Sequence, residues 1–221
     1  MKRIISMILT IAMMLSMGCM LTGCDKATRK VIGTWKADVD ITEAMNESFA
    51  DSLSTIAKGA ASYFNFKGYS LTFEITFRKD GTYTRSVDKN SVNSLYTRMW
   101  NDIYNGLEKY FRDTFKKQGL TGSVNDILRR TTGKSLKQIV DLDIMANLPA
   151  PQDMEAEEGC YVVQDNMIFF SLDKKTKPDG TNYDTFHMHD GDLVLEFCFC
   201  SMEPEEKKYN DLLYPMIFKK Q

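Results

Sequence analysis

Two hydrophobic periods alternate along the chain. From residue 31 onward, most apolar residues alternate with polar ones in short runs, which is the period of half-buried β-strands. Two interruptions instead space their apolar residues by three and four, which is the period of amphipathic helices. The predicted strands cover about 31–41, 70–78, 82–88, 159–164, 167–173, 184–189, 192–200 and 212–219. The pattern therefore predicts a mainly β fold with an α insertion.

Short turns join the predicted strands into antiparallel hairpins. Residues 71–77 alternate strictly, Lys79-Asp80-Gly81 is a turn sequence, and residues 82–87 run back. The pairs Asp165-Asn166 and Asp190-Gly191 supply the turns of two later hairpins. Eight short antiparallel strands at hairpin spacing predict a closed up-and-down barrel. The interior of such a barrel is filled by side chains or holds one small ligand.

The helical period appears in two places. Residues 42–58 carry an apolar stripe behind Thr42, which is a good N-terminal cap. A longer helical block occupies about 91–148, with a long amphipathic helix at 94–117 and shorter helices at 123–130 and 135–142. We interpret this block as an insertion and not as a second domain, because the strands on either side of it need each other to form a sheet.

The N-terminal stretch through Cys24 has a distinctive order of basic, apolar and small residues. Lys2 and Arg3 precede an uncharged apolar run from Ile4 to Leu21, and Gly23-Cys24 follows directly. This arrangement resembles the lipobox of bacterial lipoproteins. The resemblance implies a signal peptide at residues 1–23, lipid on Cys24 and a lipidated tether at 24–30.

A membrane-spanning helix is the alternative interpretation of the apolar run, whose length lies at the lower edge of a spanning segment. The lipobox is favoured because charged residues end the run immediately after Cys24. Two or three acyl chains there give stable anchoring. We therefore expect a lipid-anchored protein on the extracytoplasmic face of the cell membrane, at the outer surface or in the periplasm.

Size and charge limit the remaining choices. Removing residues 1–23 from the 221-residue chain leaves 198 residues, which we assign to the tether and one domain at 31–221. The formal charge is −2 for the whole chain, and about −4 without Lys2 and Arg3. No basic patch of the size that nucleic-acid binding requires stands out, so nucleic acid is excluded as a partner.

Three segments resemble the lipocalin, or calycin-type, barrel. Val31-Ile32-Gly33-Thr34-Trp35 places a glycine two residues before a tryptophan, as in the first strand of lipocalins. The helix at 42–58 and the hairpin from Phe77 to Tyr83 are similar to those of bacterial lipocalin-like lipoproteins. The resemblance implies that Trp35 closes one end of the barrel and that a basic residue, Lys219 or Lys220, covers it. The helical block and the lysine in place of the family's arginine are departures from the pattern.

An inward-facing aromatic set follows from the strand alternation. Its members could line an apolar ligand pocket or fill a core, and both give the same sequence pattern. The candidate ligand-binding residues are Phe73, Phe77, Tyr83, Tyr161, Phe170, Phe186 and Phe197.

Other chemistry finds little support in the sequence. His187 and His189 share one strand face at a spacing that zinc sites use, but no third ligand is fixed, and we interpret them as exposed polar residues beside a turn. No nucleophile motif or phosphate loop is present, so we predict neither an enzyme nor a cofactor or metal site. Cys160, Cys198 and Cys200 either form one disulfide that includes Cys160 or pack as small apolar residues.

Two functional hypotheses follow from the sequence. In the first, the barrel of a membrane-anchored lipoprotein binds a small hydrophobic ligand. In the second, a filled barrel without a ligand serves as an envelope interaction or structural module, and the helical insert meets a protein partner. The sequence leaves open the ligand, the type of envelope and the oligomeric state.

Overall fold

The structure, a computed structural model, describes residues 26–56, 59–147, 156–199 and 211–221. Cys24, its predicted signal peptide and Cys200 lie outside the described residues. Within the described ranges, none of the helices combines the length and apolar character needed to cross a membrane.

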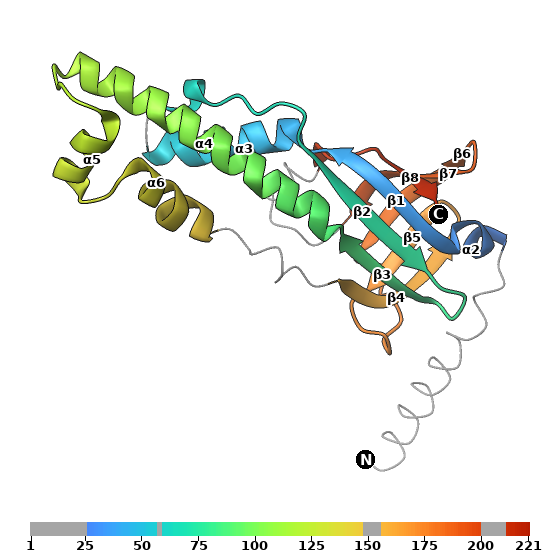
Figure 1. The fold of residues 1–221 in the computed structure, drawn as a ribbon. Helices are drawn as coiled ribbons and strands as arrows, with labels where there is room; N and C mark the ends of the chain where they lie inside the picture. The colour runs from blue at the N-terminus through green and yellow to red at the C-terminus, as the bar shows by residue number, and fades with distance from the viewer. Residues whose placement is uncertain (1–25, 57–58, 148–155, 200–210) are drawn as a thin grey trace, which may run out of the picture. The chain divides into compact units, whose positions relative to one another are not determined.

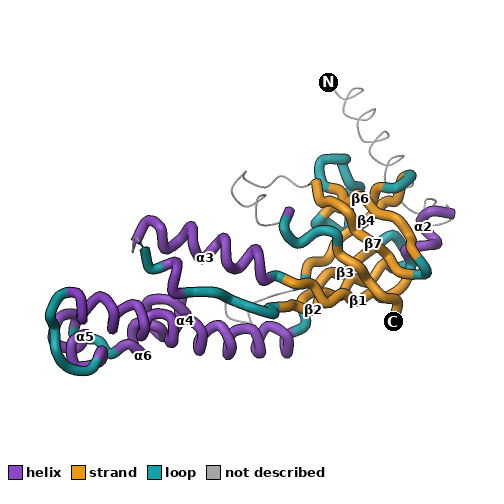
Figure 2. The backbone as a smooth tube through the Cα atoms, turned by 90° about the horizontal axis from the view of Figure 1, so that it is seen from above, coloured by secondary structure: helices purple, strands orange, loops and turns teal. Residues whose placement is uncertain are grey.

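The chain divides into two compact units. The barrel unit contains residues up to 39 together with 72–88 and 155–221, and the helical unit contains 40–71 and 89–154. The strands gather in the first unit, and the helices α3 to α6 gather in the second (Figures 1 and 2). The helical unit thus includes both helical stretches that the sequence predicts, which are separated in the chain by a β-hairpin.

The barrel unit is a closed barrel of eight antiparallel strands in sequential order, as predicted, and is consistent with a lipocalin-like fold. The last strand returns to the first through the pair Trp35 and Lys220. It begins four residues later than predicted, immediately after Pro215, which has no N–H to donate to a ladder. The strands are β1 (Gly33–Asp40), β2 (Ser70–Phe77), β3 (Thr82–Val87), β4 (Glu157–Gln164), β5 (Met167–Ser171), β6 (Tyr183–His189), β7 (Asp192–Phe199) and β8 (Met216–Lys220).

A short helix, α2 (Lys26–Val31), stands where the sequence predicts a polar tether and, at residue 31, the start of the first strand. The Ile32 N–H donates to the Thr28 carbonyl, and the side chains of Thr28 and Val31 are buried. The helix contacts β4. One helical turn brings Thr28 and Val31 to the same side, so that both side chains are buried together.

The strand pair β6–β7 contains a β-bulge. Phe186 pairs with Leu195, whereas Thr185 pairs with Phe197, so that Glu196 is an extra residue on β7. An extra residue reverses the facing of every position beyond it. The bulge therefore determines which side chains of β7 enter the barrel.

The helical unit is built around α4 (Lys89–Lys117), which starts five residues before the predicted helix. Ser135 caps the α6 turn through a capping box with Gln138. The helix then continues as a π-helix, which the sequence does not predict. The other elements are α3 (Thr42–Ile56), the 3₁₀ turn η2 (Ala61–Tyr63), α5 (Val124–Thr132), α6 (Leu136–Gln138), the π-helix η3 (Ile139–Ile144) and the 3₁₀ turn η4 (Met145–Asn147).

Aromatic residues hold α3 and the segment after it against α4. Phe49 of α3 meets Phe64 and Phe66 edge to face, with ring centroids 4.8 and 5.1 Å apart. The Tyr69 hydroxyl donates to Asp102 of α4 at 2.6 Å. Gly106 of α4 leaves the space that the Phe64 ring occupies, since a Cβ at Gly106 would lie 2.4 Å from that ring. The helical unit therefore has a core of its own.

Candidate functional site in the barrel interior

Strand alternation places the predicted aromatic set on the inner face of the barrel, with one exception. Tyr83 is 0% exposed, Phe77 1%, and Tyr161 and Phe170 3%. Phe186 is also buried, and Phe73 is half-buried. Five strands thus contribute rings to one apolar interior.

These rings pack directly on one another. Phe77 lies 4.8 Å from Tyr161 between ring centroids, and Tyr83 lies 4.9 Å from Phe170, both pairs meeting edge to face. Phe77 and Phe170 stack at 6.3 Å. Because almost none of this aromatic surface is accessible to water, the rings fill the space between them.

Phe197 is the exception and corrects the prediction. Its side chain is 37% exposed on the outer face, while the next residue, Cys198, is buried. Simple alternation from Leu195 would have placed Phe197 inside. The extra residue Glu196 in the bulge reverses the facing beyond it and sends Phe197 outward.

A charged pair lies among the inner side chains. Asp184 of β6 is 1% exposed, and its Oδ2 atom accepts a hydrogen bond from Arg85 Nη2 of β3 at 3.0 Å. The guanidinium carbon of Arg85 also lies 4.6 Å from the centre of the Phe170 ring, within range of a cation–π interaction. The side chain of Arg85 is 31% exposed, so water still reaches part of it. The pair is therefore asymmetric, with a buried carboxyl and a partly hydrated cation.

The second carboxyl oxygen of Asp184 is the unusual atom of this site. Among the described residues, Oδ1 has no hydrogen-bond partner and is shielded from water. Burial raises the pKa of Asp184 above its ordinary value, and the charge of Arg85 and the thiol of Cys198 oppose that rise. A buried polar atom without a partner is costly and calls for a specific explanation.

Buried tyrosines of the interior have hydrogen-bond acceptors. The Tyr83 hydroxyl donates to Glu157 Oε1 at 2.6 Å, and the Tyr161 hydroxyl donates to the Arg78 carbonyl at 2.9 Å. Burial raises the pKa of both phenols, so they remain neutral donors at physiological pH. These bonds fix the two rings in place within the aromatic packing.

Trp35 and its neighbours form a second cluster, at the pairing of β1 with β8. Trp35 is 1% exposed, and its Nε1 donates to the Val31 carbonyl at 2.6 Å. Lys220 Nζ lies 5.2 Å from the centre of its ring. Gly33 has a φ of +139°, and a Cβ there would lie 2.9 Å from the Lys220 stem. Of the two lysines left open by the sequence, Lys220 is therefore the one that covers Trp35.

The other candidate groups lie away from this interior. His187 and His189 are exposed, and His187 Nδ1 is 3.0 Å from Glu196 Oε1. Across the described ranges, no group of three or more His, Cys, Asp or Glu side chains is placed to hold a metal ion. Cys160 and Cys198 are not joined in a disulfide; the Cys160 thiol donates to the Lys174 carbonyl.

A hollow of about 360 Å³ lies at the connection from β5 to β6. Phe170, Leu172 and Asn182 contribute to its lining, so one member of the aromatic set reaches it. The carboxylates in it are used locally, because Asp173 accepts from Thr176 and Asp179 accepts from Thr181. Its polar groups thus stabilise turns in the loop.

Sequence reasoning missed Arg85 and Asp184, although the signal was present. Arg85 lies between Tyr83 and Val87 on β3, and Asp184 lies two residues before Phe186 on β6. Period-two alternation places both on the inner face.

Comparisons with protein-family models, curated proteins and solved structures returned no match to the chain.

Proposed function

We propose that the protein is a lipid-anchored lipoprotein of the cell envelope, in which a filled lipocalin-like barrel is the scaffold for a helical recognition unit. The observation that carries this proposal is the direct ring-to-ring packing of Phe77, Tyr83, Tyr161 and Phe170. A barrel evolved to hold a ligand keeps space between such rings. The Gly23-Cys24 sequence supports the anchor.

A small ligand inside the barrel is the second candidate function, and Asp184 is the observation that favours it. Its Oδ1 atom is a buried acceptor that a ligand hydroxyl, amide or amine would satisfy. Such a ligand would also meet the Phe170 ring and Arg85, which lies over it. It would have to displace at least one of the packed rings.

Native mass spectrometry of the chain from residue 25 onward, which contains every described residue, separates the two functions. The scaffold predicts the mass of the polypeptide alone, an empty solvent extract and no binding of a fluorescent fatty acid. A co-purifying small molecule that Asp184→Asn loses, and the exposed control Asp190→Asn retains, would establish the ligand function and overturn the filled scaffold.

Metabolic labelling with an alkyne-tagged fatty acid tests the anchor in cells that express the whole chain. The wild-type protein and Cys19→Ser should be labelled, because Cys19 lies within the predicted signal peptide. Cys24→Ser should lose the label. Equal labelling of Cys24→Ser and wild type would contradict the assignment of the lipid to Cys24.

A further inference from the structure

The helical unit presents a basic surface with an exposed apolar residue where α4 is followed by α5. We propose that this surface, the tip formed by residues 108–130, binds an anionic phospholipid membrane. The proposal specifies what the helical unit recognises. It rests on the part of the proposed function that makes the helical unit a recognition unit, and it does not depend on the lipid anchor.

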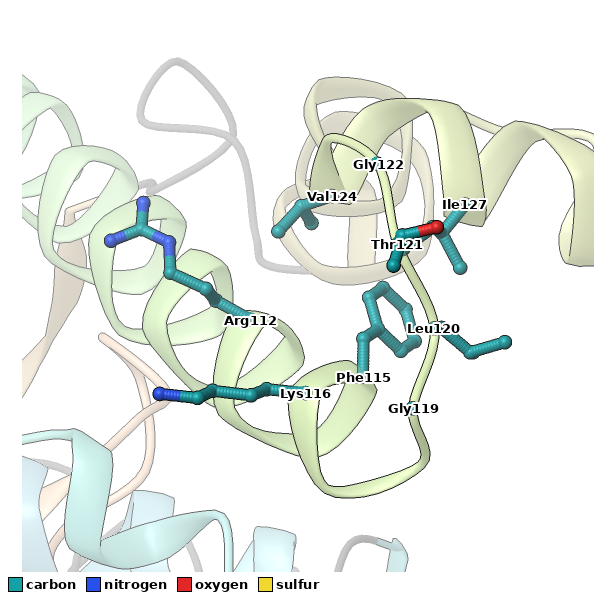
Figure 3. Close-up of a pocket in the computed structure, with 9 residues that line it drawn as sticks. All are labelled: Arg112, Phe115, Lys116, Gly119, Leu120, Thr121, Gly122, Val124 and Ile127. Carbon is teal, nitrogen blue, oxygen red and sulfur yellow. The ribbon is translucent and has the colours of Figure 1, made fainter.

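The tip contains a hollow of about 280 Å³ (Figure 3). Phe115 of α4 and Val124 and Ile127 of α5 supply its apolar lining. Arg112 and Lys116 lie on the α4 side, and the connecting loop 119–122 closes the other side. This volume lies just below the range of small-molecule sites, about 300–1,000 Å³, so the hollow admits only a small group such as a headgroup phosphate.

Cations outnumber acids around this hollow. Residues 108–130 hold six basic and three acidic side chains, a formal +3 in a chain whose total is −2. Arg112 pairs with Glu108 at 2.9 Å, but the two side chains are 63% and 40% exposed, and such a surface pair is weak enough to exchange for a phosphate. Arg130 Nη2 also lies near, 3.4 Å from where a Cβ on Gly122 would stand. The tip is therefore charged to complement an anionic surface.

Leu120 makes the tip specific for a membrane over an acidic protein. It is 44% exposed in the loop between Gly119 and Gly122, and its side chain points away from Phe115 (Figure 3). An exposed apolar side chain that closely follows Lys116 and Lys117 in the chain matches a bilayer surface, where acyl chains lie just beneath anionic headgroups. Leu120 would enter the interface while Lys116 and Lys117 meet phosphates.

Vesicle sedimentation of the unlipidated chain from residue 25 onward tests the proposal. Vesicles of 30% phosphatidylglycerol in phosphatidylcholine should bind the chain at least about tenfold more tightly than pure phosphatidylcholine, and high salt should reduce the difference. Each phosphate-facing lysine contributes about fivefold, so Lys116→Gln with Lys117→Gln should weaken binding about tenfold or more. Leu120→Asn should weaken it several-fold.

Matched controls are present on the barrel unit. Lys174→Gln with Lys175→Gln removes an adjacent lysine pair, and Leu172→Asn removes a leucine that is 67% exposed. Both controls should bind like wild type. Equal binding to the two vesicle types, or equal losses in tip and control variants, would overturn the proposal. So would tighter binding to a labelled hexaglutamate peptide, which would assign the tip to an acidic protein. Because no lipid on Cys24 takes part, failure here is distinct from failure of the anchor.

Discussion

At the scale of single residues, the Gly-x-Trp motif has a physical explanation in Lys220. The motif requires glycine because Gly33 has a φ of +139° and faces the lysine stem closely. Lys220 lies over the buried Trp35 ring, and Lys219 is exposed next to it. The motif and the lysine, nearly 190 residues apart in the chain, thus form one cluster.

We predict that Lys220→Ala lowers the free energy of unfolding by about 1 kcal/mol, because it removes a cation–π contact and the packing of the stem. Lys219→Ala is the matched control and should change the free energy of unfolding by less than about 0.5 kcal/mol. Denaturant titration followed by tryptophan fluorescence measures both. Equal effects of the two substitutions would show that the contact with Trp35 adds nothing.

Asp184 makes the stability of the protein depend on pH. Burial raises its pKa in the folded chain above the ordinary value of 3.8 for an aspartate. The folded chain therefore keeps a proton over a pH range in which the unfolded chain has lost it. The contribution of Asp184 to the free energy of unfolding consequently falls as pH rises from about 4, and it levels off above the folded pKa.

We predict that the stability of wild type relative to Asp184→Asn falls between pH 4 and pH 8, because burial raises the pKa of Asp184 in the folded chain. The amide does not titrate, so only the wild-type chain loses this contribution. Thermal and denaturant unfolding across that range gives the difference. Asp190→Asn, with a side chain that is 90% exposed, should show no such trend. A difference that grows with pH in favour of wild type would contradict the raised pKa.

At the scale of secondary-structure elements, the bulge in β6–β7 explains the one error in the aromatic set. The sequence around Glu196 alternates without a break, so periodicity places Phe197 inside. The register shows two residues of β7 opposite one of β6 at this point. The side of the sheet to which side chains point beyond a bulge depends on how the strand pairs with its partner. The local sequence does not encode this pairing.

The long helix α4 contains a glycine for a reason of packing. Gly106 is buried against the Phe64 ring, and an added Cβ would overlap that ring at 2.4 Å. Glycine in a helix normally costs about 1 kcal/mol relative to alanine. The close approach of Phe64 reverses that expectation here.

We predict that Gly106→Ala destabilises the protein by about 1–3 kcal/mol despite its better helix propensity. In a Phe64→Leu background the same substitution should be close to neutral or stabilising, because the smaller side chain leaves room. A double-mutant cycle of unfolding free energies measures this coupling. Gly119→Ala does not serve as a control for this experiment, because the backbone at Gly119 has a φ of +71° and alanine is strained there whatever it contacts. Additive effects of Gly106 and Phe64 would refute the steric explanation.

At the scale of the whole molecule, two compact units arise from one chain that leaves the barrel twice. Residues 40–71 leave after β1 and return at β2, and residues 89–154 leave after β3 and return at β4. The backbone bond from Ile41 N–H to the Tyr69 carbonyl joins the two ends of the first excursion. The helical periods in the sequence predict helices in both of these segments. The two segments form one core through contacts between residues far apart in sequence, such as Tyr69 with Asp102.

The sequence by itself determined the eight strands, the main helices and the barrel class, because periods of 2 and 3.6 and turn residues are local properties of the chain. It also contained the inward positions of Arg85 and Asp184, which follow from the same alternation. Only the tertiary structure decided that Arg85 and Asp184 meet, that Lys220 covers Trp35 and that Phe197 faces outward. Those outcomes depend on register, bulges and barrel closure, which are set by pairing between strands distant in sequence.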